Sequence, residues 1–291
     1  MTAWHSIAGQ VFRSVPSTLP GKTRVAKFFL RRSLHTEDVV LETGDTTRFL
    51  VPHLAEPIAF HLLIDGSYEL ETRSFILQRL MEGDVFVDVG ANVGVFTVSA
   101  ARKVGAKGRV LAIEASPRIF PYLERNVQLN HLDNVIVANF AASDGAEDEA
   151  SFYEAPAAQF GMGSLAPQFD VKPATVKTRT LDGLLKDQGI DRVAVLKVDV
   201  EGHEAAVFRG SEGLLRGPGA PAIVFEFCDW AENRFGESRP GAAQAFLMSL
   251  GYKIWRLSDL AKGSARPLSE PLTSGSAMLA ALRDVPGRLQ R

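Results

Sequence analysis

The chain has 291 residues, 46% of them hydrophobic, and a formal net charge of −2. A chain of this length can bury a complete core, and its balanced charge lacks the basic footprint of non-specific nucleic-acid binding, so we expect no nucleic-acid partner. The single cysteine, Cys228, excludes an intrachain disulfide framework and suits a reducing compartment, and no apolar run approaches the roughly 20 residues that span a bilayer. We expect a cytoplasmic protein with one large α/β domain.

Residues 1–67 form the predicted N-terminal extension. Within it, segment 22–32 combines basic and apolar residues at helical spacing, and no acid occurs before Glu37. We predict an amphipathic helix over 22–32, which either covers a domain edge or lies on an anionic membrane or a partner. The second alternative would bring the protein to the inner face of the membrane. A further helix is predicted over 68–81.

From residue 84 onward, strand and helix patterns alternate in the order of a doubly wound α/β sheet with seven strands. The expected strands are 85–89, 109–114, 134–139, 193–199, 221–227, 252–256 and 277–282, and the expected helices are 94–104, 117–130, 203–215 and 240–250. Right-handed crossovers place the carboxyl ends of parallel strands along one edge of the sheet. We therefore expect the functional site along that edge.

One connection is longer than a crossover needs, because more than 50 residues separate Asn139 from Val193. We predict a lid-like insertion at about 148–180, with two strands flanking a segment, 155–173, that is rich in Ala, Pro, Gly and Gln. Long loops in compact domains are usually functional lids or disordered segments. The sequence leaves open whether this segment is a lid or a plain surface loop.

The strand at 85–89 ends in an acid and a small-residue turn, Asp88-x-Gly90-x-Asn92-x-Gly94. Gly90 allows close approach of a ligand, and Asn92 tolerates a left-handed backbone. The G-x-G-x-x-G pattern of dinucleotide sites is missing, and the Asp88 carboxylate would repel phosphates. This acid suits the cationic amine and the sulfonium of S-adenosylmethionine. Alternatively, Asp88 only fixes the turn by hydrogen bonding.

Polar residues also follow the next two strands. Glu114 ends the second strand, where an acid can accept hydrogen bonds from both hydroxyls of a ribose; the alternative is a charge that favours a helix N-terminus. After the third strand, Ser143 and Asp144 offer short polar side chains to an adenine amino group, and small neighbours leave room for the ring. The alternative is a simple turn at Asp144-Gly145.

The fourth strand is followed by a dense constellation of ionisable residues, three acids and a histidine within six residues. We predict that Asp199 lies near a reacting methyl group, that Glu201 orients an acceptor hydroxyl or takes its proton, and that His203 is a second candidate base, unless it is only a surface residue. Glu226 interrupts an apolar strand and needs a donor, a raised pKa or a position at the mouth of the site, so we predict a role in substrate binding. Nothing in the spacing requires a metal.

With these residues in view, the chain resembles the FkbM family of S-adenosylmethionine-dependent methyltransferases. The resemblance covers roughly 68–217, through the motifs FVDVGANVG, AIEASP, AASD, TLD and LKVDVEGHE. It implies a class I methyltransferase fold and O-methylation of hydroxyls on sugars, glycans or polyketide-type natural products. By position it implies cofactor binding by Asp88, Gly90, Asn92, Gly94, Glu114 and Asp144, and acceptor contact by Asp199, Glu201 and Glu226. The position of His203 varies in similar proteins, which weakens its role as an essential base.

The resemblance divides the chain into the extension and a methyltransferase domain at 68–291 with its core at 84–256. Residues 1–67 and about 257–291 match the family poorly, and the identity of the acceptor is expected to depend on them and on the 155–173 segment. Two other functions stay open at this point. One is an NAD(P)-dependent oxidoreductase, and the other is a membrane-surface or partner-docking module with a vestigial cofactor fold. The oligomeric state is not indicated.

Overall fold

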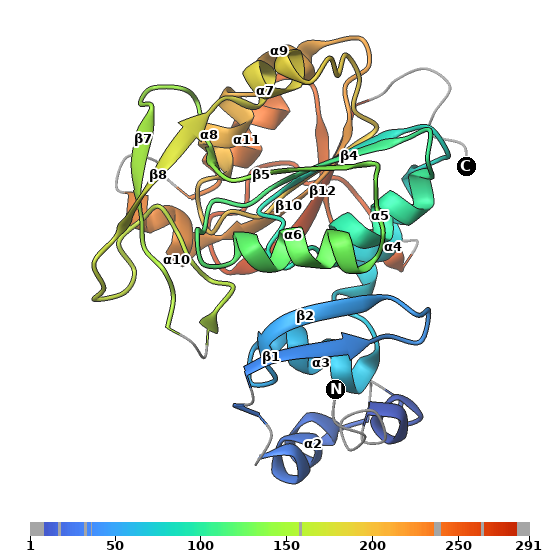
Figure 1. Cartoon of the computed structure of the whole chain (residues 1–291). Helices are drawn as coiled ribbons and strands as arrows, with labels where there is room; N and C mark the ends of the chain where they lie inside the picture. The colour runs from blue at the N-terminus through green and yellow to red at the C-terminus, as the bar shows by residue number, and fades with distance from the viewer. Residues whose placement is uncertain are drawn as a thin grey trace.

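The structure, a computed structural model, describes residues 9–16, 19–31, 34–35, 37–156, 159–235, 240–262 and 265–283. A central sheet carries helices on both faces, and the N-terminal part of the chain, drawn in blue, lies to one side of it (Figure 1). Among the described residues, no helix is long and apolar enough to cross a membrane.

The seven predicted strands of the central sheet are all present. They are β3 (Val85–Val89), β4 (Arg109–Ile113), β5 (Val135–Ala138), β9 (Val195–Val198), β10 (Ala222–Cys228), β11 (Lys253–Arg256) and β12 (Ser276–Leu282). Their order is β11-β12-β10-β9-β3-β4-β5. β12 runs antiparallel to both neighbours, a reversal that the sequence did not indicate. This topology is the class I methyltransferase fold that the resemblance implies.

Helices cover both faces of the sheet. They are α4 (Leu70–Arg79), α5 (Val95–Val104), α6 (Phe120–Leu129), α7 (Leu181–Asp187), α8 (Glu204–Arg209), α9 (Glu212–Arg216), α11 (Ala242–Ser249) and α12 (Leu257–Ala261), with the short α10 (Asp229–Glu232) and η2 (Asn233–Phe235) after β10. The single helix predicted over 203–215 is wrong, because the chain breaks at Gly210 into α8 and α9. A Cβ atom at Gly210 would lie 1.9 Å from the carbonyl oxygen of Ser143, so only glycine fits this crossing.

Alternation of apolar side chains along the strands builds the two halves of the core. Phe86 lies in register with Val195 and packs with residues of α4 and α5 on one face. Val87 lies in register with Leu196 and packs with residues of α7 and α8 on the other face. All four side chains are buried, so the sheet is covered on both sides.

The N-terminal extension contains a helical stretch at 9–13, then α2 (Lys22–Leu30), an antiparallel hairpin of β1 (Glu37–Glu42) and β2 (Arg48–His53), and α3 (Pro57–Asp65). α2 confirms the predicted basic helix, whereas the hairpin and α3 were not predicted. Asn126 of α6 joins this part to the domain, since its side-chain amide donates to the carbonyl oxygens of Leu50 at 3.0 Å and Val93 at 2.8 Å. The extension is thereby held beside the turn that follows β3.

The long connection forms a three-stranded sheet of β6 (Ala141–Ala142), β8 (Ala174–Arg179) and β7 (Glu149–Phe152), in that order. The two-stranded pairing predicted for the insertion is present as β7 and β8, and β6 adds a third strand. Between β7 and β8, the chain bridges back on itself at Tyr153 and Ser164. This return brings the loop toward the carboxyl edge of the central sheet.

Candidate active site

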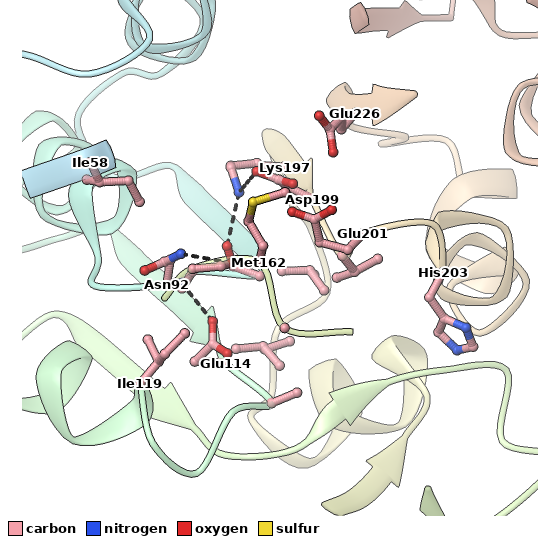
Figure 2. A pocket seen from close by; sticks show the side chains of 18 of the residues that line it. Ile58, Asn92, Glu114, Ile119, Met162, Lys197, Asp199, Glu201, His203 and Glu226 are labelled. Atoms are coloured by element: carbon pink, nitrogen blue, oxygen red, sulfur yellow. Dashed lines mark hydrogen bonds and ion pairs between the residues drawn. The ribbon is translucent and has the colours of Figure 1, made fainter. Parts of the chain in front are cut away.

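A cavity of about 290 Å³ opens at the carboxyl ends of β3, β4, β9 and β10. Figure 2 shows Asp199, Glu201 and Glu226 on one side of it and Glu114 and Ile119 on another. Among the described residues, six carboxyl side chains line the cavity: Glu56, Glu69, Glu114, Asp199, Glu201 and Glu226. Small and apolar side chains form the wall near β4 and β5: Ile119, Phe140, Ala141 and Ala142.

The turn after β3 contains three residues with left-handed backbone angles, Gly90, Asn92 and Gly94. Gly90 has φ +76°, and a Cβ atom there would lie 1.8 Å from the carbonyl oxygen of Asp199, so the turn can pass the end of β9 only with glycine. Asn92 has φ 51° and lines the cavity beside Gly90. Gly94 does not line the cavity; it begins α5, and a Cβ atom there would meet Leu123 at 2.8 Å.

Asp88 is fully buried and does not line the cavity. Its carboxylate accepts a hydrogen bond from the Thr97 hydroxyl at 2.7 Å and lies 3.4 Å from the Lys197 ammonium. Lys197 in turn donates to the carbonyl oxygen of Gly90 at 3.1 Å and lies 3.3 Å from the Asp199 carboxylate. This position does not support direct cofactor contact by Asp88 and favours the alternative, in which Asp88 fixes the turn through Lys197.

Lys197 is the buried link between the two halves of the site. Burial alone would lower the pKa of its ammonium, but the carboxylates of Asp199 and Asp88 raise that pKa above its usual range. The ammonium therefore stays charged and holds the end of β9 against the β3 turn. Lys197 lies within a buried, otherwise apolar strand. A charged residue in such a strand needs a partner, and this could have marked Lys197 as a candidate site residue from the sequence.

Glu114 lines the cavity and organises the backbone around it. Its carboxylate accepts one hydrogen bond from the backbone N–H of Asn92 and one from that of Ser116, both at 2.8 Å. Burial raises the pKa of Glu114 to about 7, against the lowering effect of these two bonds. Each carboxylate oxygen can accept a second hydrogen bond, so ribose binding by Glu114 stays a prediction compatible with its position.

Ser143 and Asp144 lie outside the cavity lining. The Asp144 carboxylate pairs with the Arg209 guanidinium at 3.0 Å, which holds the pKa of Asp144 below its usual range although partial burial opposes the shift. The Ser143 hydroxyl lies 3.3 Å from Nε2 of His203. Their side chains therefore have partners inside the protein, and contact of either with adenine is not supported by this geometry.

Hydrogen bonds to Glu204 fix the loop after β9, and the acids Asp199 and Glu201 at this loop line the cavity. The fully buried Glu204 accepts hydrogen bonds from the backbone N–H groups of Val200 at 3.0 Å and Gly202 at 3.4 Å. Between them, Glu201 adopts φ 54°, a conformation that costs energy for a residue other than glycine. This backbone conformation lowers the stability of the fold, and it accompanies a carboxyl group that lines the cavity.

The carboxyl groups of Glu201 and Glu226 crowd the β9–β10 side of the cavity beside Asp199, and neither makes a hydrogen bond with another described residue. Burial and the Asp199 charge raise the pKa of Glu201 to about 7. Burial, with the charges of Asp199 and Glu201, raises the pKa of Glu226 to about 9. Burial lowers the pKa of His203 to about 4, and its ring lies 5.1 Å from that of Phe235, so it is a neutral imidazole near pH 7. Among the described residues, no three His, Cys, Asp or Glu side chains are arranged to hold a metal ion.

Comparison with known sequences gives the family. Residues 88–254 match the Methyltransferase FkbM domain. The chain belongs to the FkbM methyltransferase family. It is an S-adenosylmethionine-dependent methyltransferase, and this assignment overrules both the oxidoreductase and the vestigial docking module.

Two curated relatives and one solved structure illustrate the similarity. Hexuronic acid methyltransferase AglP of Haloferax volcanii is 30% identical over 174 residues, which cover 60% of this chain and 68% of that protein. Methyltransferase sdnD of Sordaria araneosa is 28% identical over 163 residues, covering 46% of this chain and 62% of that protein. The O-methyltransferase of Bacillus cereus in complex with SAH is 13% identical, with a TM-score of 0.43 over 95% of this chain and 97% of that one.

The cavity of this FkbM methyltransferase also contains residues that the sequence did not single out. Glu56, Tyr68 and Glu69 come from the N-terminal part of the chain, where no motif marks them. Glu69 adopts φ 43°, and its carboxylate accepts a hydrogen bond from the Thr72 hydroxyl at 3.0 Å. An acid directly before a helix is too common a pattern to indicate a site by itself.

The loop of the insertion also reaches the cavity, at Gln159 and 161–163. The Asn92 side-chain amide donates to the carbonyl oxygen of Gly161 at 3.4 Å, and the Ser164 hydroxyl donates to the carbonyl oxygen of Glu201 at 3.1 Å. The loop is thus tied to both the β3 turn and the β9 loop. A movable lid stays a prediction, but a plain surface loop does not fit these contacts.

Proposed function

We propose that this methyltransferase transfers the methyl group of S-adenosylmethionine to a hydroxyl oxygen of a sugar, glycan or polyketide-type natural product. The observation that carries the proposal is the group of acids Asp199, Glu201 and Glu226 at one side of the cavity. Lys197 and His203 are the basic side chains among its described lining residues, and Lys197 already lies against Asp88 and Asp199. Like charges repel strongly in a desolvated site, so a neutral acceptor suits it better than an anionic one.

The residues of the cavity fit S-adenosylmethionine. Glu114, Ala141 and Ala142 line the same cavity, where the small alanine side chains leave room for a nucleoside, and the β3 turn contributes Gly90 and Asn92. When bound, this cofactor supplies a methyl group that is already activated on a sulfonium. We assign ribose binding to Glu114 and acceptor binding to the β9–β10 acids.

The chemical task left to the protein is to align an acceptor hydroxyl and remove its proton. Glu201 is our candidate for the base, because a pKa of about 7 keeps much of it ionised at neutral pH while it still binds a proton readily. Asp199 would orient the hydroxyl from its fixed position beside Lys197. His203 stays a second candidate base, since its neutral ring also lines the cavity.

The relative from Haloferax volcanii supports a sugar as the acceptor class, because its name describes a hexuronic acid methyltransferase. A hexuronic acid offers both hydroxyls and a carboxylate. The acids of the present cavity favour methylation of a hydroxyl, which gives a methyl ether, over methylation of a carboxylate, which gives a methyl ester.

The two products differ in stability to base, and this difference tests the proposal. The protein is incubated with methyl-tritiated S-adenosylmethionine and fractions of metabolite extract and cell envelope, and each labelled fraction is treated with mild alkali. We expect label that survives alkali and that decreases strongly with Glu201→Gln. Label released as methanol would show ester formation and would overturn the hydroxyl assignment.

A further inference from the structure

α2 lies at the end of the extension that is remote from the central sheet (Figure 1). One face of it is locked onto the protein. The buried Lys22 ammonium pairs with the Asp65 carboxylate of α3 at 2.7 Å and donates to the carbonyl oxygen of Val15 at 2.8 Å. Ala26 and Leu30, on the same face, are fully buried. The rest of the helix surface, here called the exposed face, therefore has a fixed orientation toward solvent.

The exposed face carries large apolar side chains, including Phe29 at its border with the buried side. Val25 is 49% exposed, and Phe28 and Phe29 are each 61% exposed. Five of the nine large apolar side chains that are exposed among the described residues lie between residues 11 and 29. A concentration of this kind, on one short stretch of chain, is typical of an interaction surface.

Cations accompany the apolar residues on the same face. Arg24, Lys27 and Arg31 are exposed, and the Arg31 guanidinium lies over the Phe28 ring at 4.9 Å. At about 100° per residue, the three cations fall on one side of this face, and Val25, Phe28 and Phe29 fall on the other. No Asp or Glu occurs before Glu37, so no acid of this segment neutralises the cations.

We propose that α2 docks the protein on an anionic membrane surface. An apolar strip beside a cationic strip matches the boundary between acyl chains and anionic headgroups, where aromatic side chains insert while Arg and Lys meet phosphates. α3 connects this face with the cavity, because Glu56, Pro57 and Ile58 at its start line the cavity and Asp65 at its end holds α2. The inference does not depend on the acceptor assigned above.

Co-sedimentation of the full chain with lipid vesicles tests this surface. We expect binding to vesicles of phosphatidylcholine with phosphatidylglycerol, and little binding to vesicles of phosphatidylcholine alone. Loss of each cation should weaken binding about fivefold, so that Arg24→Gln with Lys27→Gln and Arg31→Gln costs about 100-fold. Phe28→Ser with Phe29→Ser should cost about tenfold or more. Raising NaCl from about 0.1 M to about 1 M should release the protein, because the Debye length falls to about 3 Å.

Matched variants keep the test specific. Met81→Ser and Lys107→Gln also change exposed side chains, at 70% and 83% exposure, and should leave vesicle binding unchanged. Melting temperature and S-adenosylmethionine affinity, measured for every variant, verify the fold. Absence of binding, or equal and salt-independent binding to neutral vesicles, would overturn the proposal. A dimer of the free protein that is lost in the Phe28→Ser, Phe29→Ser variant would assign the face to self-association instead, and would also overturn it.

Discussion

At the β3–β4 end of the cavity the carboxyl groups have fixed hydrogen-bond partners, whereas at the β9–β10 end Glu201 and Glu226 crowd beside Asp199 without such partners among the described residues. Glu114 accepts two backbone hydrogen bonds, and Asp88 is held by Thr97 and Lys197. By contrast, the carboxyls of Glu201 and Glu226 make no hydrogen bond among the described residues, and burial together with the nearby Asp199 charge raises their pKa values.

This difference suits the two ends of the cavity to two roles, cofactor binding and proton transfer. A prearranged end gives a cofactor fixed donors and acceptors with little reorganisation, whereas carboxyls with raised pKa values can exchange protons near neutral pH. We therefore expect substitutions at the first end to change cofactor affinity and substitutions at the second to change turnover.

The largest effect is expected at the second end. Glu201→Gln removes the proposed base and should lower kcat by about 10²–10⁴-fold, with the dissociation constant of S-adenosylmethionine nearly unchanged. Asp199→Asn should also lower kcat more than affinity, because it leaves Lys197 in place. Steady-state kinetics beside calorimetry separates the two quantities. Unchanged turnover in both variants would refute the assignment of these acids.

Gly90→Ala should destabilise the protein where the β3 turn crosses the end of β9. The added methyl group meets the carbonyl oxygen of Asp199, and the residue has a positive φ. We expect a loss of about 3 kcal/mol in the free energy of unfolding. Gly83→Ala is the matched control, because Gly83 has φ +88° but open space around it, and it should cost only about 1 kcal/mol. If urea unfolding showed the same loss of unfolding free energy for both variants, the close contact between Gly90 and Asp199 would not be what requires glycine at position 90.

Glu114→Gln should weaken S-adenosylmethionine binding by about 10- to 100-fold, because hydrogen bonds to a carboxylate are stronger than those to an amide. In the native protein, ribose hydroxyls would favour the charged form of Glu114 and lower its pKa from about 7. Binding near pH 6.5 should therefore release protons, which calorimetry in buffers of different ionisation enthalpy detects. Glu124→Gln, on the exposed side of α6, should change neither result.

The smallest effect concerns stability. The pKa of Glu226 is about 9 in the folded protein and near 4.5 when unfolded, so between these values the folded state binds more protons. The free energy of unfolding must then fall as pH rises through this window. In Glu226→Gln, the free energy of unfolding should decrease less with rising pH than in the native protein. The variant should therefore be about 2 kcal/mol more stable than the native protein at pH 8. An identical pH dependence in the two proteins would contradict the raised pKa.

The sheet and the positions of the strand-end residues were predictable because buried strands carry continuous apolar runs and parallel strands share one edge. The sequence placed Gly90, Asn92, Glu114, Asp199, Glu201 and Glu226 near one another, and all six line the cavity. It could not show which acids have internal partners. Asp88 and Asp144 are acids in the sequence just as Glu201 is, and only the folded chain brings Lys197 and Arg209 to them.

The cavity residues from the N-terminal part of the chain could not be predicted for a different reason. Glu56 reaches the cavity because the extension packs on α6 through Asn126, whose side chain bonds the backbone of Leu50, 76 residues away. Short elements such as α3 and the β1–β2 hairpin have no long periodic pattern, and their placement depends on tertiary packing.

The pH dependence of kcat at saturating cofactor and acceptor tests the central claim most directly, because Glu114 then stays in its cofactor-bound state and the acceptor end controls the profile. The account predicts that kcat of the native protein rises with pH through about 7, as Glu201 ionises, and that this rise is absent in Glu201→Gln. The same rise in Glu201→Gln, at undiminished kcat, would show that another group takes the proton and would contradict the account.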